Sequence, residues 1–145
     1  MTSPMPLPLI TLGTAAVLAL IFVGLSVNVV RHRSGAKISL GDDSRRIGFG
    51  EEFSAPPLFI AARIHANFAE YVPLSLLLLM MIELIAAPRW AVEVLAAMLI
   101  IARLLHPIGM VRSTPNPFRA GGVLLQWAML VLGGVYALVL VSGLM

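Results

Sequence analysis

Cysteine is absent from the 145 residues of the chain, and charged residues make up only 12% of it. Without cysteine the protein cannot form a disulfide, a thiolate nucleophile or a thiolate metal site, so any thiol chemistry requires a bound molecule. With 59% hydrophobic residues and a mean hydropathy of +0.97, the chain has too little polar surface for a water-soluble domain. Lipid is therefore its expected solvent.

A run of basic residues is also missing. The pI is about 10.2, yet the net charge is only +3 and the ten Lys and Arg residues are scattered along the chain. Nucleic-acid binding is disfavoured, because it needs a concentrated basic surface. The three histidines do not form a His-x-x-x-His pair, so no metal site is expected either.

Four long apolar runs fill most of the sequence. A hydrocarbon core is crossed by about 20 helical residues, and we expect helices over residues 7–30, 58–87, 90–110 and 120–144. The predicted fold class is an all-α membrane protein, a four-transmembrane-helix bundle in one domain, residues 1–145. A cleaved signal peptide is the alternative for the first run, but no basic residue precedes it, and Arg31 and Arg33 follow it.

The basic residues of the connections predict the orientation. The polar loop 31–57 holds five of them and the third connection holds Arg112 and Arg119, whereas the second connection holds only Arg89. Lys and Arg accumulate on the cytoplasmic side of membrane proteins. We therefore expect the 31–57 loop to be cytoplasmic and both termini to be non-cytoplasmic.

Polar side chains inside the second run gather on one helical face. At about 100° per residue, Asn67, Glu70 and Tyr71 fall within about 80° of Arg63, and His65 falls on the opposite side. Ionisable groups are costly inside a membrane and usually face a bundle interior or an aqueous cavity. This face is therefore a candidate functional site.

The third run adds a second polar face at a similar depth. Arg103, His106 and Met110 lie within about 60° of one another, and Arg103 and Glu70 are each roughly 14–20 Å from the cytoplasmic ends of their helices. With Arg119 nearby, the cluster would be cationic with one central carboxylate, which suits an anionic ligand that carries an amino group. The alternative is that Glu70 and Arg103 form a buried ion pair that only fixes helix packing.

The remaining polar residues of the runs receive structural interpretations. Glu83, Arg89 and Glu93 lie at the far end and are interpreted as interfacial or snorkelling residues. His65 is interpreted as a packing or inter-helix hydrogen-bonding residue. The run from Leu74 to Met81 is expected to face lipid or fill the core.

The second run also carries a family motif. It closely resembles the second-helix signature of the membrane-associated proteins in eicosanoid and glutathione metabolism, the MAPEG family, in the pattern Arg63-x-x-x-Asn67-x-x-Glu70-Tyr71-x-Pro73-Leu74. The segment from Lys37 to Asp42 resembles the first loop of bacterial members. The resemblance covers nearly the whole chain, since Arg103-x-x-His106 and Arg119 also fit.

The resemblance implies both an assembly and an activity. It implies a homotrimer in a bilayer, here a bacterial inner membrane, with glutathione as co-substrate bound between neighbouring subunits near the cytoplasmic face. The implied activity is that of a glutathione-dependent transferase or peroxidase acting on lipophilic electrophiles. A non-catalytic membrane subunit or scaffold that retains the fold is the alternative.

Roles for individual residues follow from the same resemblance. Arg119 matches the catalytic arginine that stabilises the glutathione thiolate, because a guanidinium near the sulfur favours the charged form and lowers the thiol pKa. Glu70 would meet the amino group of the tripeptide, and Arg63 a carboxylate or backbone polar group. The other glutathione-binding positions would be Asn67, Tyr71, Arg103 and His106.

Two positions depart from the pattern. Met110 stands where well-studied members carry a tyrosine, and Ala66 stands where some members carry a further arginine. Both departures predict a weakened or altered pocket.

Overall fold

The computed structural model describes residues 7–44, 55–85, 87–112 and 116–144. Within these ranges the chain forms four α-helices, α1 (Leu9–Ala36), α2 (Pro57–Leu84), α3 (Arg89–Met110) and α4 (Pro117–Leu144). All four are long and apolar enough to cross a membrane. The predicted all-α architecture of four long apolar helices is confirmed.

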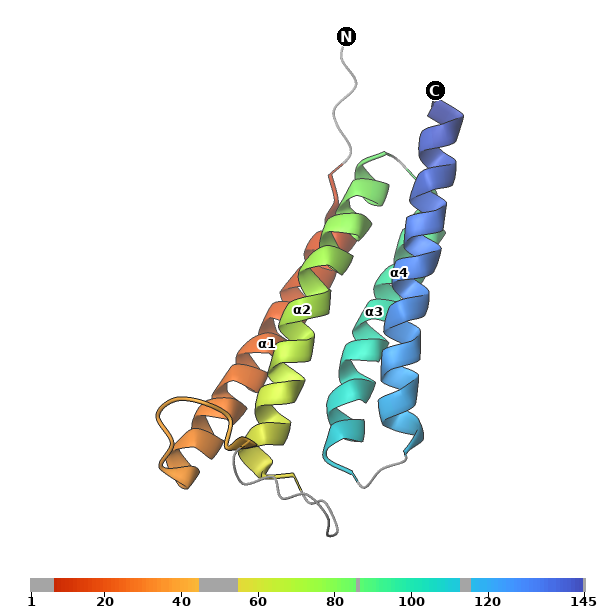
Figure 1. Ribbon diagram of the computed structural model, residues 1–145. Helices are drawn as coiled ribbons and strands as arrows, with labels where there is room; N and C mark the ends of the chain where they lie inside the picture. The colour runs from red at the N-terminus through yellow and green to blue at the C-terminus, as the bar shows by residue number, and fades with distance from the viewer. Residues whose placement is uncertain (1–6, 45–54, 86, 113–115, 145) are drawn as a thin grey trace.

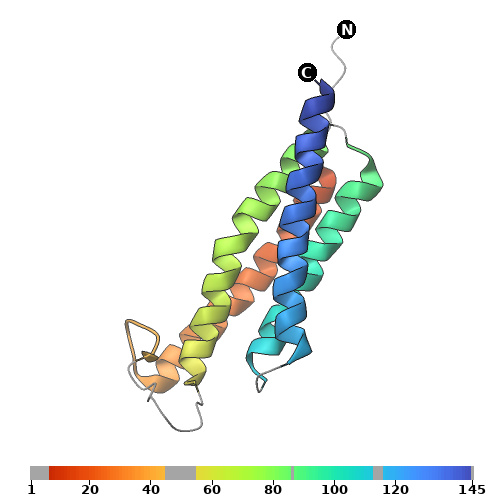
Figure 2. The same cartoon turned by 45° about the vertical axis from the view of Figure 1, so that its right-hand side comes forward.

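The helices alternate in direction and form two pairs. α1 packs along α2, and α3 packs along α4 (Figure 1). The turned view shows α4 passing between α2 and α3 on the near face (Figure 2). The start of α1 and the end of α4 therefore lie at the same end of the bundle as the α2–α3 connection, and the other two connections lie at the opposite end.

α2 contributes the longest buried stripe of the bundle. Its buried residues recur at intervals of three or four, as a helix packed along one face requires, and they are Leu58, Ala61, Ile64, Phe68, Val72, Ser75, Leu79 and Ile82. The part of the stripe between Phe68 and Ile82 packs with Leu18 of α1, Leu99 of α3 and Met129 of α4. Because lipid tails are as apolar as these side chains, close packing and interhelical hydrogen bonds hold such a bundle together.

Two glycines let α3 and α4 approach closely. A Cβ atom at Gly122 would lie 2.8 Å from the backbone nitrogen of His106. A Cβ atom at Gly109 would overlap the backbone of Arg119. The α3–α4 contact is therefore backbone against backbone, and it fixes where His106 and Arg119 lie.

α1 ends at Ala36 rather than near residue 30, so part of the predicted loop is helical. Helical hydrogen bonds do not need apolar side chains, and a C-terminal capping motif sets the end instead. The Lys37 N–H donates to Ser34 O (3.3 Å) and the Ile38 N–H donates to Arg33 O (3.1 Å), which is the Schellman pattern. Lys37 takes the left-handed conformation that this motif requires, with φ of 55°.

Candidate functional site

Arg103 of α3 is the centre of the polar cluster. Its side chain is almost fully buried, with 1% of the residue exposed. Nη1 of Arg103 donates to Oδ1 of Asn67 (2.9 Å), and the guanidinium carbon lies 5.8 Å from the ring centroid of Tyr71. Three of the predicted site residues therefore meet between α2 and α3, and they join the two helix pairs.

Glu70 lies outside this contact. It is exposed at the surface of the chain, and the guanidinium of Arg103 bonds to Asn67 instead. Among the described residues no ion pair joins Glu70 to Arg103, so the alternative of a buried ion pair between them is wrong for the single chain. The reason is rotational, because α2 turns Asn67 toward α3 and Glu70 away from it.

Arg63 and Glu70 share one exposed stripe of α2. The stripe continues along the helix through Leu74, Leu77 and Met81, which are 50–59% exposed. Its polar half lies toward the 31–57 loop, and its apolar half lies toward the α2–α3 connection. The predicted leucine-rich run is thus divided, because Leu79 is fully buried while these three residues face outward.

His106 and Arg119 both lie at the α3–α4 contact but differ in exposure. His106 is buried against Gly122, with 6% of the residue exposed, whereas the Arg119 side chain is exposed. Asn116 positions the start of α4, because its Oδ1 accepts the Arg119 N–H (2.9 Å) and its Nδ2 donates to Gly109 O (2.8 Å). This is the geometry of a helix N-cap that also ties α4 to α3.

Three residues that the sequence analysis did not single out support Tyr71. Nε2 of Gln126 donates to Oγ of Ser75 (2.9 Å), and this hydroxyl donates to the carbonyl oxygen of Tyr71 (2.8 Å). Nε1 of Trp127 lies 3.4 Å from the Tyr71 hydroxyl. A lone amide in the otherwise apolar fourth run was the signal that could have identified Gln126.

Two buried polar atoms in this region have no hydrogen-bond partner among the described residues, Nε of Arg103 and Oε1 of Gln126. Buried polar groups are normally hydrogen-bonded, and exceptions often mark sites that a ligand or water completes. The centre of the bundle therefore retains unused hydrogen-bonding capacity close to Tyr71.

The structural interpretation of His65 is confirmed. Its Nε2 lies 3.0 Å from Oγ of Ser26, and its ring stacks on Phe22 with centroids 4.6 Å apart. Both contacts join α1 to α2.

Glu83 has a different role from the one predicted. Its carboxylate accepts the Ile10 N–H (2.9 Å), the Thr11 N–H (2.8 Å) and the Thr11 hydroxyl (2.7 Å). It therefore caps the N-terminus of α1, whose first-turn amides lack intrahelical partners, and is not a snorkelling residue. Arg89 and Glu93 do lie at the surface and pair with each other at 2.7 Å.

The described residues contain no group of three or more His, Asp or Glu side chains that could hold a metal ion. The cluster instead offers guanidinium, amide, phenol, imidazole and carboxylate groups to an organic ligand.

The part of the chain that contains this cluster matches the model of a known protein family. The family model for MAPEG matches residues 11–139, which include every residue of the cluster. The chain belongs to the MAPEG family. As a MAPEG protein with four long apolar helices, it is an integral membrane protein.

Curated relatives of this MAPEG protein include a bacterial membrane protein. The inner membrane protein YecN of Escherichia coli (strain K12) is 31% identical to it over 118 residues, which are 81% of this chain and 82% of YecN. The protein of the same name from Escherichia coli O6:H1 matches to the same extent. No solved structure matches the chain.

Proposed function

We propose that the protein is a membrane-bound glutathione-dependent transferase or peroxidase that acts on lipophilic electrophiles. The observation that carries this proposal is the exposure of Glu70 and Arg63 on a membrane-spanning helix, each about one turn from the Asn67 side of the buried Arg103–Asn67 contact. Membership of the MAPEG family supports glutathione as the ligand.

Energetics favour a covered site at this face. A charged side chain near the middle of a bilayer costs about 2.5–3.5 kcal/mol on insertion scales, so Glu70, at the middle of α2, requires a polar partner in the assembled protein. A neighbouring subunit of a homotrimer, with glutathione between the subunits, would provide it. Mass measurement in mild detergent tests the assembly, and a stable monomer would remove the proposed inter-subunit site.

Each predicted residue has a place in this proposal. Glu70 would bind the ammonium group of glutathione and Arg63 a carboxylate, because charge-assisted hydrogen bonds are the strong ones. Arg119 would stabilise the thiolate. The sulfur would then form a bond to carbon as the leaving group departs with its electron pair. With a peroxide, the sulfur would take one oxygen to give a sulfenic acid and an alcohol, and a second glutathione would displace water to form the disulfide. The remaining ligands would be Asn67, Tyr71, Arg103 and His106.

The same proposal includes an orientation. The end of the bundle with the two basic connections would face the cytoplasm, so glutathione would enter from water there. The lipophilic substrate would arrive through the bilayer. The name of the relative YecN supports a bacterial inner membrane as the location.

A scaffold without catalysis is the second candidate, and one observation favours it. Arg103 and Asn67 already bond to each other inside one chain, so at least part of the motif serves packing. The departures at Met110 and Ala66 point the same way.

Glutathione binding to the detergent-purified protein separates the two candidates. Replacing Glu70 by Gln should weaken binding by about 1–3 kcal/mol, the scale of a lost charge-assisted hydrogen bond, or roughly tenfold or more in affinity. Glu93→Gln is the matched control, because it removes an exposed carboxylate at the other end of the bundle. Titration calorimetry measures both, and a wild-type protein that binds no glutathione would favour the scaffold.

A second measurement, of thiolate formation by bound glutathione, tests the proposed catalytic role of Arg119. Arg119→Ala should leave glutathione bound but raise the pKa of its thiol, so the ultraviolet thiolate absorbance near neutral pH should fall. Arg112→Ala is the control, since Arg112 is exposed in the same connection and stacks on Phe118 at 4.2 Å. Bound glutathione without any thiolate signal in the wild type would exclude the assigned role of Arg119.

A further inference from the structure

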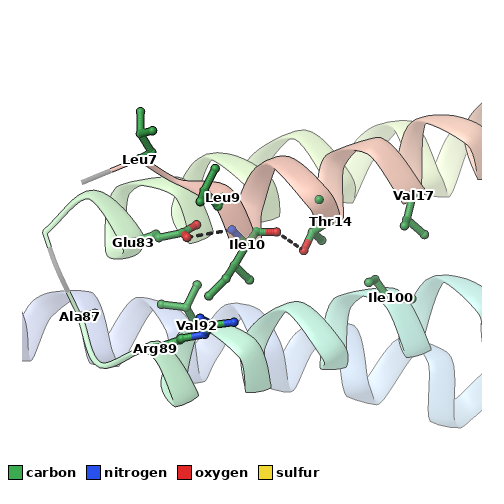
Figure 3. Close-up of a pocket in the computed structure, with 11 residues that line it drawn as sticks. Leu7, Leu9, Ile10, Thr14, Val17, Glu83, Ala87, Arg89, Val92 and Ile100 are labelled. Carbon is green, nitrogen blue, oxygen red and sulfur yellow. Dashed lines mark hydrogen bonds between the residues drawn. The ribbon is translucent and has the colours of Figure 1, made fainter. Parts of the chain in front are cut away.

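A cavity lies far from the polar cluster, at the end of the bundle that carries the start of α1. It has a volume of about 780 Å³ and runs between α1 and α3 (Figure 3). Pockets of roughly 300–1,000 Å³ commonly hold small-molecule ligands. Its α1 wall extends from Leu9 to Val17, roughly 12 Å along the helix.

The wall of this groove is mostly apolar, and the polar groups of Thr14 and Glu83 in it are already hydrogen-bonded within the protein. Thr14 and Glu83 are polar residues of the lining, but the Thr14 hydroxyl donates to Ile10 O (2.8 Å). The Glu83 carboxylate is occupied by the first turn of α1, as Figure 3 shows in part. Apolar side chains form most of the rest of the surface, notably Val17, Val92 and Ile100.

The groove opens at the surface of the bundle on α1. Gly13 belongs to its lining, and a Cβ atom there would meet no other atom within 4 Å. Leu9 and Val17 are 63% and 43% exposed on the same helix. Since α1 spans the membrane, a hydrocarbon chain can reach the groove sideways from the bilayer.

The mouth of the groove carries one charge of each sign. Arg89 lines the groove, and Glu93 is paired with it; their side chains are 82% and 49% exposed. Nε of Arg89 is used in that pair, but a guanidinium has further N–H donors in its fork. Trp90, 68% exposed beside them, is a residue typical of the membrane–water interface.

We propose that this groove binds a zwitterionic phospholipid from the leaflet on the side of the chain termini. One acyl chain lies along Ile10, Gly13 and Val17, the phosphate meets the Arg89 guanidinium, and the amine of the headgroup meets the Glu93 carboxylate. An anionic lipid without an amine would leave Glu93 unmatched. The proposal does not depend on glutathione binding at the other end of the bundle.

Native mass spectrometry tests it after extraction from vesicles that contain equal amounts of phosphatidylethanolamine and phosphatidylglycerol. The wild type should retain one phosphatidylethanolamine per protomer, and Gly13→Phe, which fills the groove, should lose it. Gly24→Phe is the matched control, because Gly24 is also an exposed α1 glycine with no atom within 4 Å but does not line the groove. Val17→Phe narrows the same groove if Gly13→Phe does not fold.

Four results would overturn the proposal. Retention by Gly13→Phe and Val17→Phe equal to the wild type would place the lipid elsewhere, and so would equal loss in Gly24→Phe. Preferential retention of phosphatidylglycerol would exclude the match to a zwitterionic headgroup. A changed number of protomers in Gly13→Phe would show that a second copy of the chain, not lipid, fills the groove.

Discussion

Arg103 is almost fully buried, yet the two side chains that contact its guanidinium are neutral. An amide oxygen from Asn67 and the face of Tyr71 provide its contacts. A buried cation that depends on so few groups is sensitive to the loss of either one, because burying an unpartnered polar group costs about 1–3 kcal/mol and a charged one more.

This arrangement predicts an unequal response to two substitutions. Asn67→Leu should destabilise the fold by at least about 1–3 kcal/mol, because it leaves the guanidinium buried without its acceptor. Arg103→Met should cost less, because it removes the buried charge together with the need for a partner and keeps an apolar chain of similar length. Thermal unfolding in one detergent compares the two variants. The opposite order would mean that the Arg103 charge itself stabilises the packing.

Glycines determine how closely whole helices pack, as at the α3–α4 contact. Glycines on α4 could in principle have served contacts with other chains, but Gly122 faces His106, and a Cβ atom at Gly133 would lie 3.1 Å from Leu78. A Cβ atom at Gly134 would meet no atom within 4 Å. Gly122 and Gly133 thus contribute to packing within one protomer, whereas Gly134 is open to a neighbour.

The element-scale prediction contrasts two alanines. Gly122→Ala should destabilise the protein by about 1–3 kcal/mol, the usual cost of overpacking, and should also disturb His106. Gly134→Ala should be neutral, or stabilising by up to about 1 kcal/mol, because alanine is the better helix former. Thermal unfolding measures both changes. Equal effects would show that the α3–α4 contact tolerates wider spacing than the structure has.

At the scale of the whole molecule, charge is divided between the two ends of the bundle. Arg31, Arg33, Lys37, Arg112 and Arg119 lie at one end, and Arg89 lies at the other. This asymmetry predicts that a reporter active only outside the cytoplasm is active when fused after Met145 and silent when inserted near Gly41. The reverse pattern would invert the orientation and place the proposed glutathione site on the other side of the membrane.

Hydropathy was sufficient to predict the four helices, and helical angle and depth were sufficient to place Asn67 and Arg103 in one cluster, where they form a hydrogen bond. Side-chain direction was not predictable to the same degree. Glu70 and Asn67 are less than one turn apart, so a modest rotation of α2 decides which of them meets Arg103. The Glu83 cap depends on hydrogen bonds from a side chain of α2 to the backbone of α1. The end of α1 depends on hydrogen bonds from Lys37 and Ile38 just after the helix. The apolar pattern of the sequence encodes neither.

The contact between Trp127 and Tyr71 should make the intrinsic fluorescence of Trp127 sensitive to changes around Tyr71. Indole emission responds to the hydrogen bonding of its N–H, and Nε1 of Trp127 lies 3.4 Å from the phenol that is a predicted glutathione ligand. The other indole, Trp90, lies at the opposite end of α3 from Arg103. In a Trp90→Phe background the remaining fluorescence should therefore change as glutathione occupies the site, and Tyr71→Phe should abolish that change. The purified, unlabelled chain would then report its own ligand occupancy in a detergent micelle or a reconstituted bilayer.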